Sequence, residues 1–341
     1  MRVRAKDIAQ ALGFSEATVS LALNNRAGVK EETRKQILEY KENASNIVPE
    51  NLLADNIAVI VVNKQLDIVC DSDISLWSDV LGTLEGCIKE RGSNLSLIYH
   101  DANGSDISQL IERCNTQMSG IILFATEMAE EDIKLFKGIL KPLIVYDNDF
   151  CSSDYQSITI DNFNASRKAV DYLVQTGHKS IGYISHEKNI YNFAQRRLGF
   201  NEAIKEHSLN PEQCIIHSLG SNTQEIYQNA AAFFSENANR FDAILTENYQ
   251  VSIGILQALQ MINLDVPQTL SIIGIDELPS YIIMDNKLTF IKIENKRRAE
   301  KGIECLYRLM ENENEPIYNL AFGTELVQGD TVRNRNKQIA E

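Results

Sequence analysis

Residues 7–24 read DIAQALGFSEATVSLALN and decide the fold of the N-terminal part of this chain. Apolar residues recur on one face of two short segments, which predicts helices over residues 6–12 and 16–24. Gly13 between them is a natural left-handed helix stop, and Ser15 is a favourable N-cap for the second helix. Two helices joined by a tight glycine turn are the layout of a helix-turn-helix DNA reader, whose second helix enters the major groove.

Charge is unevenly distributed around this segment. The 341-residue chain has a formal net charge of −14. Residues 1–45 hold eight Lys or Arg and six Asp or Glu, so they carry +2 and the remainder carries −16. This asymmetry favours a small cation-bearing head on an acidic body, with ordinary surface variation as the alternative that charge alone leaves open.

A third helix is predicted over residues 31–42, after a loop at residues 24–28. The stretch VKEETRKQIL at residues 29–38, together with residues 7–24, resembles the head of the LacI/GalR family of bacterial repressors. The match is long and has no gap. The resemblance implies a sequence-specific DNA-binding transcriptional regulator, in particular a repressor of carbohydrate-utilisation genes, with its head at residues 1–45.

The family positions that contact DNA are transferred to this head residue by residue. The resemblance implies DNA contacts by Lys6, Ser15, Glu16, Ala17, Thr18, Ser20, Leu21, Asn24, Arg26 and Arg34. The positions that contact or orient phosphates are Thr18, Ser20 and Asn24. The base-reading positions are Glu16, Ala17 and Leu21. A glutamate can accept a hydrogen bond from cytosine N4, and an alanine can touch a thymine methyl group.

Leu21 departs from the arginine that is common at its position in the family. A leucine cannot make the bidentate guanine contact, which is worth about 1–3 kcal/mol, so the operator should differ from the commonest family sites. Simple packing of the Leu21 side chain is the alternative explanation.

Residues 46–56 are a linker that is shorter than the family pattern by roughly two helical turns. Family members place a short hinge helix here, whose leucine wedges into the minor groove of DNA. Leu52 or Leu53 is available for that role. The stretch has no arginine, however, and carries Glu50 and Asp55, which DNA phosphates would repel. The sequence therefore leaves open whether a hinge helix forms.

From residue 57 onward, short apolar strands alternate with amphipathic helices. Strands are predicted at residues 57–62, 95–99, 120–125, 143–146, 157–160, 180–185, 214–218, 243–246 and 271–275. Helices are predicted at residues 79–91, 106–117, 130–140, 165–176, 193–207, 223–236 and 251–261. Non-alternating strands separated by helices indicate parallel sheets buried on both faces. The number of strands favours an α/β core of two doubly wound subdomains.

The body also resembles the family's core, which is similar to periplasmic sugar-binding proteins. The motifs that carry this resemblance include RRLGF at residues 196–200 and VPQTLSIIGIDE at residues 266–277. We expect an N-terminal core subdomain at residues 57–160 plus about 292–322. We expect a C-terminal core subdomain at residues 161–291 plus about 323–332, and a tail at residues 333–341. Ligands of such folds bind at the carboxyl ends of the strands, between the subdomains.

The resemblance implies an effector site formed by Trp77, Asp161, Arg196, Asn248 and Asp276. Arginine offers a rigid fork of donors, and aspartate accepts from two neighbouring hydroxyls, which suits the diols of a sugar. Purely structural roles stay open for three of these residues. Arg196 could pair with Glu202, Asp276 could cap a turn, and Trp77 could be part of the core. The second aromatic residue that the family places in the cleft is absent near residues 219–221. Ile293 stands at a position that is polar in the family. The resemblance therefore does not identify the ligand.

Other functions are disfavoured by absent motifs. The chain has no GxGxxG, P-loop, HExxH or GxSxG motif, so we expect neither an enzyme nor a cofactor. The five histidines and six cysteines have no metal-ligand spacing, so we expect no metal, and the cysteines are expected to be reduced. No apolar run approaches about 18 residues and no secretory signal is recognised, which predicts a cytoplasmic protein without membrane contact.

Several alternatives remain for the partners. We expect a homodimer on a palindromic operator, because two heads double the phosphate contacts and the base readout. The effector is expected to be a sugar that switches operator affinity through closure of the cleft. A nucleoside or purine, or a phosphocarrier protein partner, is the alternative input. A solute-binding protein without a DNA role is the remote alternative.

Overall fold

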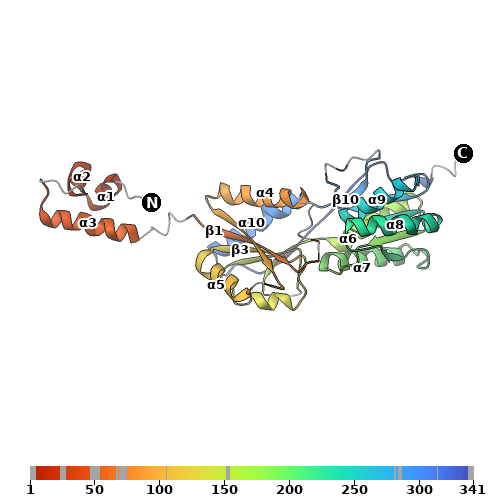
Figure 1. The fold of residues 1–341 in the computed structure, drawn as a ribbon, viewed down its shortest axis with the longest axis horizontal. Helices are drawn as coiled ribbons and strands as arrows, with labels where there is room; N and C mark the ends of the chain where they lie inside the picture. Colours follow the sequence, from red (N-terminus) through yellow and green to blue (C-terminus); the bar gives the residue numbers. More distant parts are fainter. Residues whose placement is uncertain are drawn as a thin grey trace. The chain divides into compact units, whose positions relative to one another are not determined.

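The structure is a computed structural model (Figure 1). It describes residues 5–23, 28–46, 54–66, 68, 75–104, 106–150, 154–279, 282, 286–312 and 314–336. The chain divides into two compact units, Met1–Asp55 and Asn56–Glu341, which are described separately. No helix in the described ranges is long and apolar enough to span a bilayer.

The first unit has three helices, α1 (Ala5–Leu12), α2 (Glu16–Leu23) and α3 (Glu31–Asn46). Their small core contains the buried residues Ile8, Ala9, Val19, Ala22 and Ile37. Gly13 ends α1 with φ +69°, and the Phe14 amide donates to the Ala9 carbonyl at 3.1 Å. The left-handed conformation is one that glycine adopts without a steric cost, so this residue permits the tight turn between α1 and α2.

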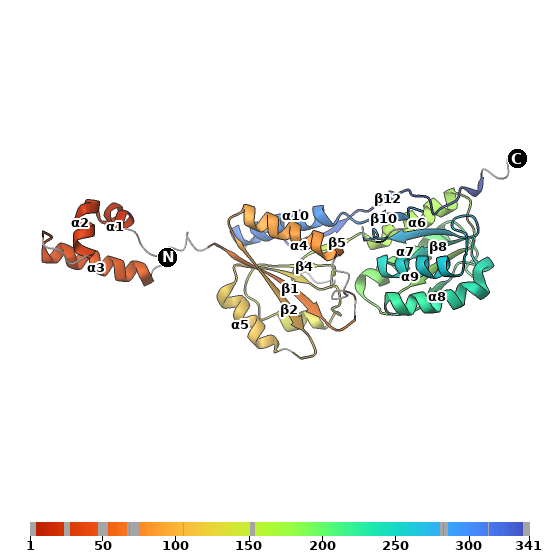
Figure 2. The same cartoon turned by 45° about the horizontal axis from the view of Figure 1, so that its top comes forward.

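The second unit contains two six-stranded sheets. The first has the order β11-β5-β4-β3-β1-β2, and all of its pairings are parallel. Its strands are β1 (Asn56–Asn63), β2 (Asn94–Asp101), β3 (Gly120–Phe124), β4 (Leu143–Tyr146), β5 (Gln156–Ile160) and β11 (Asn319–Phe322). The helices packed around it are α4 (Ser75–Glu90), α5 (Ile107–Gln117) and α10 (Asn295–Glu311). Helices α4 and α10 cover one face of the sheet and α5 covers the other (Figure 2).

The second sheet has the order β12-β10-β9-β8-β6-β7, in which only β12 is antiparallel to its neighbour. Its strands are β6 (Ile181–Ser185), β7 (Ile216–Ser218), β8 (Ala243–Thr246), β9 (Ser271–Ile275), β10 (Thr289–Lys292) and β12 (Glu325–Val327). Its helices are α6 (Asn162–Gln175), α7 (Tyr191–Glu206), α8 (Thr223–Asn237) and α9 (Tyr249–Met261). Helices α6 and α7 cover one face, and α8 and α9 cover the other.

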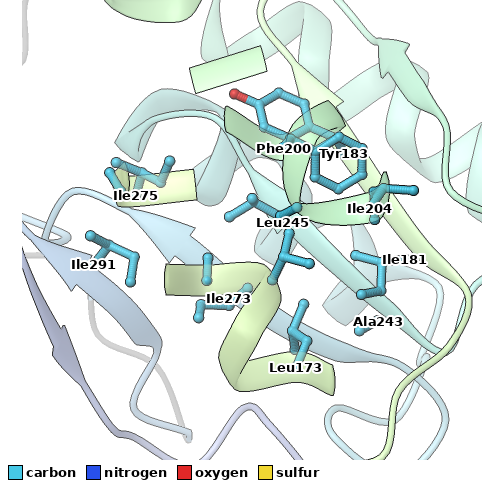
Figure 3. Close-up of a cluster of buried hydrophobic side chains, with 14 of the residues drawn as sticks. Leu173, Ile181, Tyr183, Phe200, Ile204, Ala243, Leu245, Ile273, Ile275 and Ile291 are labelled. Atoms are coloured by element: carbon cyan, nitrogen blue, oxygen red, sulfur yellow. The ribbon is translucent and has the colours of Figure 1, made fainter. Parts of the chain in front are cut away.

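The apolar sequence of these strands fits their burial on both faces of each sheet. Strand β1 reads NIAVIVVN, and its six central residues are all buried, because helices cover both sides of the sheet. The same holds in the second sheet, where Leu173, Tyr183, Phe200 and Leu245 pack in one cluster (Figure 3). The predicted fold class, a small helical head and two parallel α/β sheets, is confirmed.

The predicted helix at residues 130–140 is wrong. The structure has only a short 3-10 helix there, η2 (Asp132–Phe136). Leu135 and Leu140 are 54% and 83% exposed, so the apolar pattern that suggested a helix is not buried on one face. The two buried residues, Ile133 and Phe136, are three positions apart, which suits the three-residue turn of a 3-10 helix.

The strands β10, β11 and β12 and the helix α10 lie where the sequence analysis predicted no element. At these elements the chain passes between the two sheets. Strand β10 belongs to the second sheet, α10 and β11 belong to the first, and β12 belongs to the second again. A further passage connects β5 to α6. These passages bring residues that are far apart in sequence to the same edge of the two sheets.

Candidate functional site

The first candidate surface is helix α2 of the head. The Ser15 hydroxyl accepts a hydrogen bond from the Thr18 amide at 3.1 Å and lies 2.8 Å from the Thr18 hydroxyl, which is the geometry of a helix N-cap. Val19 is buried in the head core, whereas Ala17 and Ser20 are exposed. One face of α2 therefore anchors the helix, and the other is free of the head core.

Two predicted DNA-contact residues, Arg34 and Leu21, are half-buried in the head. Arg34 on α3 donates from Nη1 to the Ala22 carbonyl at 3.2 Å, so it ties α3 to the end of α2. Leu21 is half-buried, so its side chain is only partly available to DNA. The other predicted positions, Asn24, Arg26, Leu52 and Leu53, lie outside the described residues, as do the side chains of Lys6 and Glu16.

The second candidate site is a cavity at the carboxyl ends of strands from both sheets of the second unit. It is partly open to solvent, and about 760 Å³ of space in and at the mouth of it is not filled by protein atoms. Its apolar lining residues are Ile68, Val80, Phe124, Tyr146, Ile160, Ile190, Phe193, Tyr249 and Ile293. Its polar lining residues are Thr126, Asp147, Asn192, Arg196, Asn248, Asp276, Asn295 and Arg298.

Arg196 on α7 is the buried cation on the side of the second sheet, with a side chain only 3% exposed. Its Nε donates to the Asn162 side-chain oxygen at 2.8 Å, and its Nη1 donates to the Glu247 carbonyl at 2.6 Å. Nη1 also lies 3.5 Å from Oδ2 of Asp276. The guanidinium is therefore fixed by its neighbours and available to a ligand along the cavity.

Asp276 follows β9 in the left-handed conformation, with φ +77°, and its amide donates to the Ile291 carbonyl at 3.1 Å. Asp147 follows β4 in the same way, with φ +64° and its amide donating to the Ile158 carbonyl at 3.0 Å. Because β4 and β9 hold the same place in the two strand orders, each sheet presents one carboxylate at an equivalent point.

Each carboxylate also has an arginine partner. Asp147 is bound by Arg298 of α10 and accepts a hydrogen bond from the Thr126 hydroxyl at 3.1 Å. Burial raises the pKa of Asp276, and the Arg196 guanidinium opposes that rise. The cavity therefore has two carboxylates and two guanidinium groups among its lining residues, in two balanced pairs.

A buried network supports Arg196 from behind. The Glu247 side chain is fully buried, and it accepts from Arg197 Nε at 2.7 Å, Arg197 Nη2 at 2.9 Å and the Tyr183 hydroxyl at 3.0 Å. The His186 amide donates to the same carboxylate at 2.8 Å. These bonds fix the residue whose backbone carbonyl binds Arg196. Burial raises the pKa of Glu247, and the Arg197 guanidinium opposes that rise.

Residues 5–42 match the family described as bacterial regulatory proteins, lacI family, and residues 170–332 match the periplasmic binding protein-like domain. The HTH-type transcriptional regulator MalR of Clostridium butyricum is 26% identical over 342 residues, which covers 96% of this chain and 99% of the relative. The chain belongs to the LacI family of bacterial transcriptional regulators.

Solved structures support the fold of this LacI-family chain. The complex of the transcriptional regulator CelR with cellobiose superposes with a TM-score of 0.71 at 16% identity, over 97% of this chain and 100% of that one. The lac repressor dimer bound to operator and the anti-inducer ONPF gives a TM-score of 0.69 at 18% identity, over 98% and 100%. A LacI-family chain is a DNA-binding regulator of transcription and not an enzyme.

Three of the five predicted effector residues line the cavity: Arg196, Asn248 and Asp276. Asn248 also caps α9, since its side-chain oxygen accepts from the Val251 amide at 3.0 Å. Asp161 is not among the lining residues, and instead caps α6 by accepting from the Asn164 amide at 3.3 Å. Trp77 is part of α4, but its side chain lies outside the described residues.

Sequence reasoning missed the acid–arginine pair of the first sheet and the buried Asn192. Asp147 follows a fully buried strand directly, so the rule that ligands bind at the carboxyl ends of parallel strands could have found it. Asn192 is the second residue of α7 and accepts from the Asn162 side chain at 2.8 Å, but only its burial reveals it. Arg298 had no such signal, because its partner is 151 residues away in sequence.

Among the described residues, no group of three or more His, Cys, Asp or Glu is arranged to bind a metal ion.

Proposed function

We propose that this protein is a repressor of carbohydrate-utilisation genes whose operator affinity is switched by a neutral sugar bound in the cavity. One observation carries the proposal: each sheet presents a carboxylate paired with an arginine, Asp147 with Arg298 and Asp276 with Arg196. Carboxylates accept hydrogen bonds from hydroxyl groups and guanidinium groups donate to them, so a polyhydroxylated ligand is complementary to both pairs.

The charge balance favours a neutral ligand over a phosphorylated one. The two aspartates offset the two arginines, which leaves no surplus cation among these four groups for a phosphate. The apolar part of the lining, including Phe124 and Phe193, suits the C–H faces of a sugar ring. The cellobiose bound in the related CelR complex supports the same ligand class.

A ligand that binds both pairs would couple the two halves of the core. It would favour the relative orientation of the two sheets in which Asp147 and Asp276 both reach it. The change in operator affinity can be no larger than the ligand's preference for that orientation. This proposal places the switch in cleft closure and not in the head itself.

The DNA contacts proposed for the head follow the exposure of α2. Glu16, Ala17 and Leu21 would read bases, and the neighbouring hydroxyls would contact phosphates, because the opposite face of the helix is buried. We propose a homodimer with one head on each half of a palindrome, located in the cytoplasm. The operator-bound dimer of the related lac repressor supports this assembly.

Fluorescence anisotropy on the DNA that flanks the protein's own gene tests the proposal. We expect saturable binding to one palindromic segment, with affinity falling steeply as salt rises. A panel of neutral sugars and nucleosides is then added to the complex. A sugar that changes the affinity of the wild type, but not of Arg196→Met, supports sugar control through this cavity. Operator binding that no sugar alters in the wild type would refute it.

A further inference from the structure

Asn162 lies behind the cavity, at the point where the chain first passes from one sheet to the other. It is the first residue of α6, which covers the second sheet, and it lies two positions after Ile160, the last residue of β5 in the first sheet. The residue is only 1% exposed and is not among the residues that line the cavity. A buried polar side chain at such a point must find its hydrogen-bond partners inside the protein.

The carboxamide of Asn162 makes three hydrogen bonds around the cavity. Its oxygen accepts from Arg196 Nε at 2.8 Å. Its nitrogen donates to the Asn192 side-chain oxygen at 2.8 Å and to the Ile160 carbonyl at 3.3 Å. A guanidinium group has only donors, so the atom that faces Arg196 must be the oxygen, and this fixes which way round the carboxamide lies.

This orientation also fixes what Asn192 offers to a ligand. Asn192 and Arg196 lie four positions apart on α7, so their side chains share one face of the helix, and both line the cavity. The Asn192 oxygen is bonded to Asn162, which leaves the NH2 group for a ligand. No described residue accepts a hydrogen bond from Nδ2 of Asn192 or from Nη2 of Arg196. These two side chains therefore present N–H donors to the cavity.

We propose that Asn162 is a positioning residue of the effector cavity, which holds Asn192 and Arg196 so that the ligand meets α7 with accepting oxygens. The inference rests on the proposed function, because it requires a sugar in the cavity. It adds the direction of the hydrogen bonds, since a sugar hydroxyl that meets Asn192 uses its lone pairs there and directs its own proton elsewhere. The carboxylates of Asp147 and Asp276, which only accept, are the complementary groups for that proton.

The substitution Asn162→Asp reverses this direction with almost no change of shape. The new carboxylate still accepts from Arg196 Nε, but it cannot donate to Asn192. Asn192 should therefore turn round, donate its NH2 group to the carboxylate and present its oxygen to the ligand. The matched control is Asn189→Asp, which adds the same charge at an exposed position outside the lining. The Asn189 oxygen accepts from Arg197 Nη1 at 3.5 Å, a role that aspartate preserves.

Monodeoxyfluoro sugars report the direction of a hydrogen bond, because a C–F group accepts weakly and cannot donate. The experiment measures the binding of glucose, galactose, mannose and their monodeoxyfluoro analogues by isothermal titration calorimetry on the full chain. For the sugar that binds, fluorination of the hydroxyl that meets Asn192 should cost about threefold in affinity in the wild type and about tenfold in Asn162→Asp. Asn189→Asp should keep the wild-type loss for every analogue.

A second background tests whether Asn162 acts through Asn192. Asn192→Ala removes the carboxamide that is turned, so adding Asn162→Asp should leave the loss for every analogue unchanged. Asn192→Asp places an oxygen at the same point and still accepts from Asn162, so it should raise the loss at that hydroxyl to about tenfold. This variant tests the proposal if Asn162→Asp does not fold. Operator binding by each variant verifies that the chain is folded.

The outcomes separate this inference from the proposed function. If a sugar binds but Asn162→Asp keeps the wild-type loss for every analogue, the inference is refuted while the sugar effector stands. The inference is also refuted if Asn162→Asp changes the losses equally in the wild type and in the Asn192→Ala background. If no sugar binds to wild-type protein that binds its operator, the sugar effector is refuted, and this inference with it.

Discussion

At the scale of single residues, His186 ties stability to pH. The residue is 1% exposed, its Nδ1 accepts from the Lys188 amide at 3.1 Å, and its ring centroid lies 5.5 Å from that of Phe193. Burial is the main cause that lowers its pKa to about 4, and Arg197 and Lys188 contribute in the same direction. In the unfolded chain the pKa would be near the ordinary value of 6.5.

The sign of the pH effect follows from these two values. Between pH 6.5 and pH 4 the unfolded chain binds a proton that folded His186 does not, so acid favours unfolding in this window. Between pH 7 and pH 5 we expect the free energy of unfolding to fall by about 2 kcal/mol more in the wild type than in His186→Gln. Urea unfolding at both pH values measures this difference. Equal pH dependence in the two proteins would contradict the prediction.

The pair of Glu247 and Arg197 gives a second prediction at this scale. Arg197→Met leaves the fully buried Glu247 without its cation and should lower the free energy of unfolding by about 3–5 kcal/mol. The double variant with Glu247→Gln should recover most of this loss, since no buried charge remains. Lys205→Met on the same helix is the control, because its pair with Glu202 is exposed and worth at most about 1 kcal/mol. Urea unfolding measures these losses of stability. A loss in Arg197→Met as small as that in Lys205→Met would show that the network is unimportant for stability.

Some cavity residues could be predicted from their neighbours in the sequence, and others could not. Asn248 and Asp276 lie in recognisable motifs beside strands, so the family resemblance was enough to predict them as cavity residues. Asp147 and Arg298 form the same kind of pair, but through a contact that the passages between sheets create. The local sequence pattern cannot indicate such a contact, because the contact depends on how distant elements are arranged in three dimensions.

At the scale of elements, the N-cap of α2 decides how firmly the first turn of this helix, the proposed DNA reader, is held. Ser15→Ala removes the acceptor of the Thr18 amide, at a cost of about 1 kcal/mol, and should speed the exchange of that amide by about fivefold. Ser15→Asp restores an N-cap, so it should restore slow exchange. Its added negative charge should nevertheless weaken operator binding at all sequences, since phosphates would repel it. Equal exchange in all three proteins would show that the cap is unimportant.

Prediction of the elements succeeded where burial follows the sequence pattern. Each of the nine predicted strands is present with its ends displaced by at most two residues. Most of them, such as β1 and β3, are apolar runs because helices cover both faces of their sheet, whereas the edge strand β2 is partly exposed. The predicted helix at residues 130–140 failed because Leu135 and Leu140 are exposed. Strand β11 alternates between more and less exposed residues, and β12 has only three residues, none of them fully buried, so neither has an apolar run to detect.

At the scale of the whole molecule, the charge distribution favours DNA contact by the head over contact by the body. Residues 1–45 carry +2 and the remainder carries −16, so the body is repelled by phosphates. If two heads share one operator, the number of neutralised phosphates doubles, and so does the slope of log affinity against log salt. On the segment found by anisotropy, we expect the slope for the full palindrome to be about twice that for a half-site. Equal slopes would show that a single head binds, and would refute the two-headed arrangement.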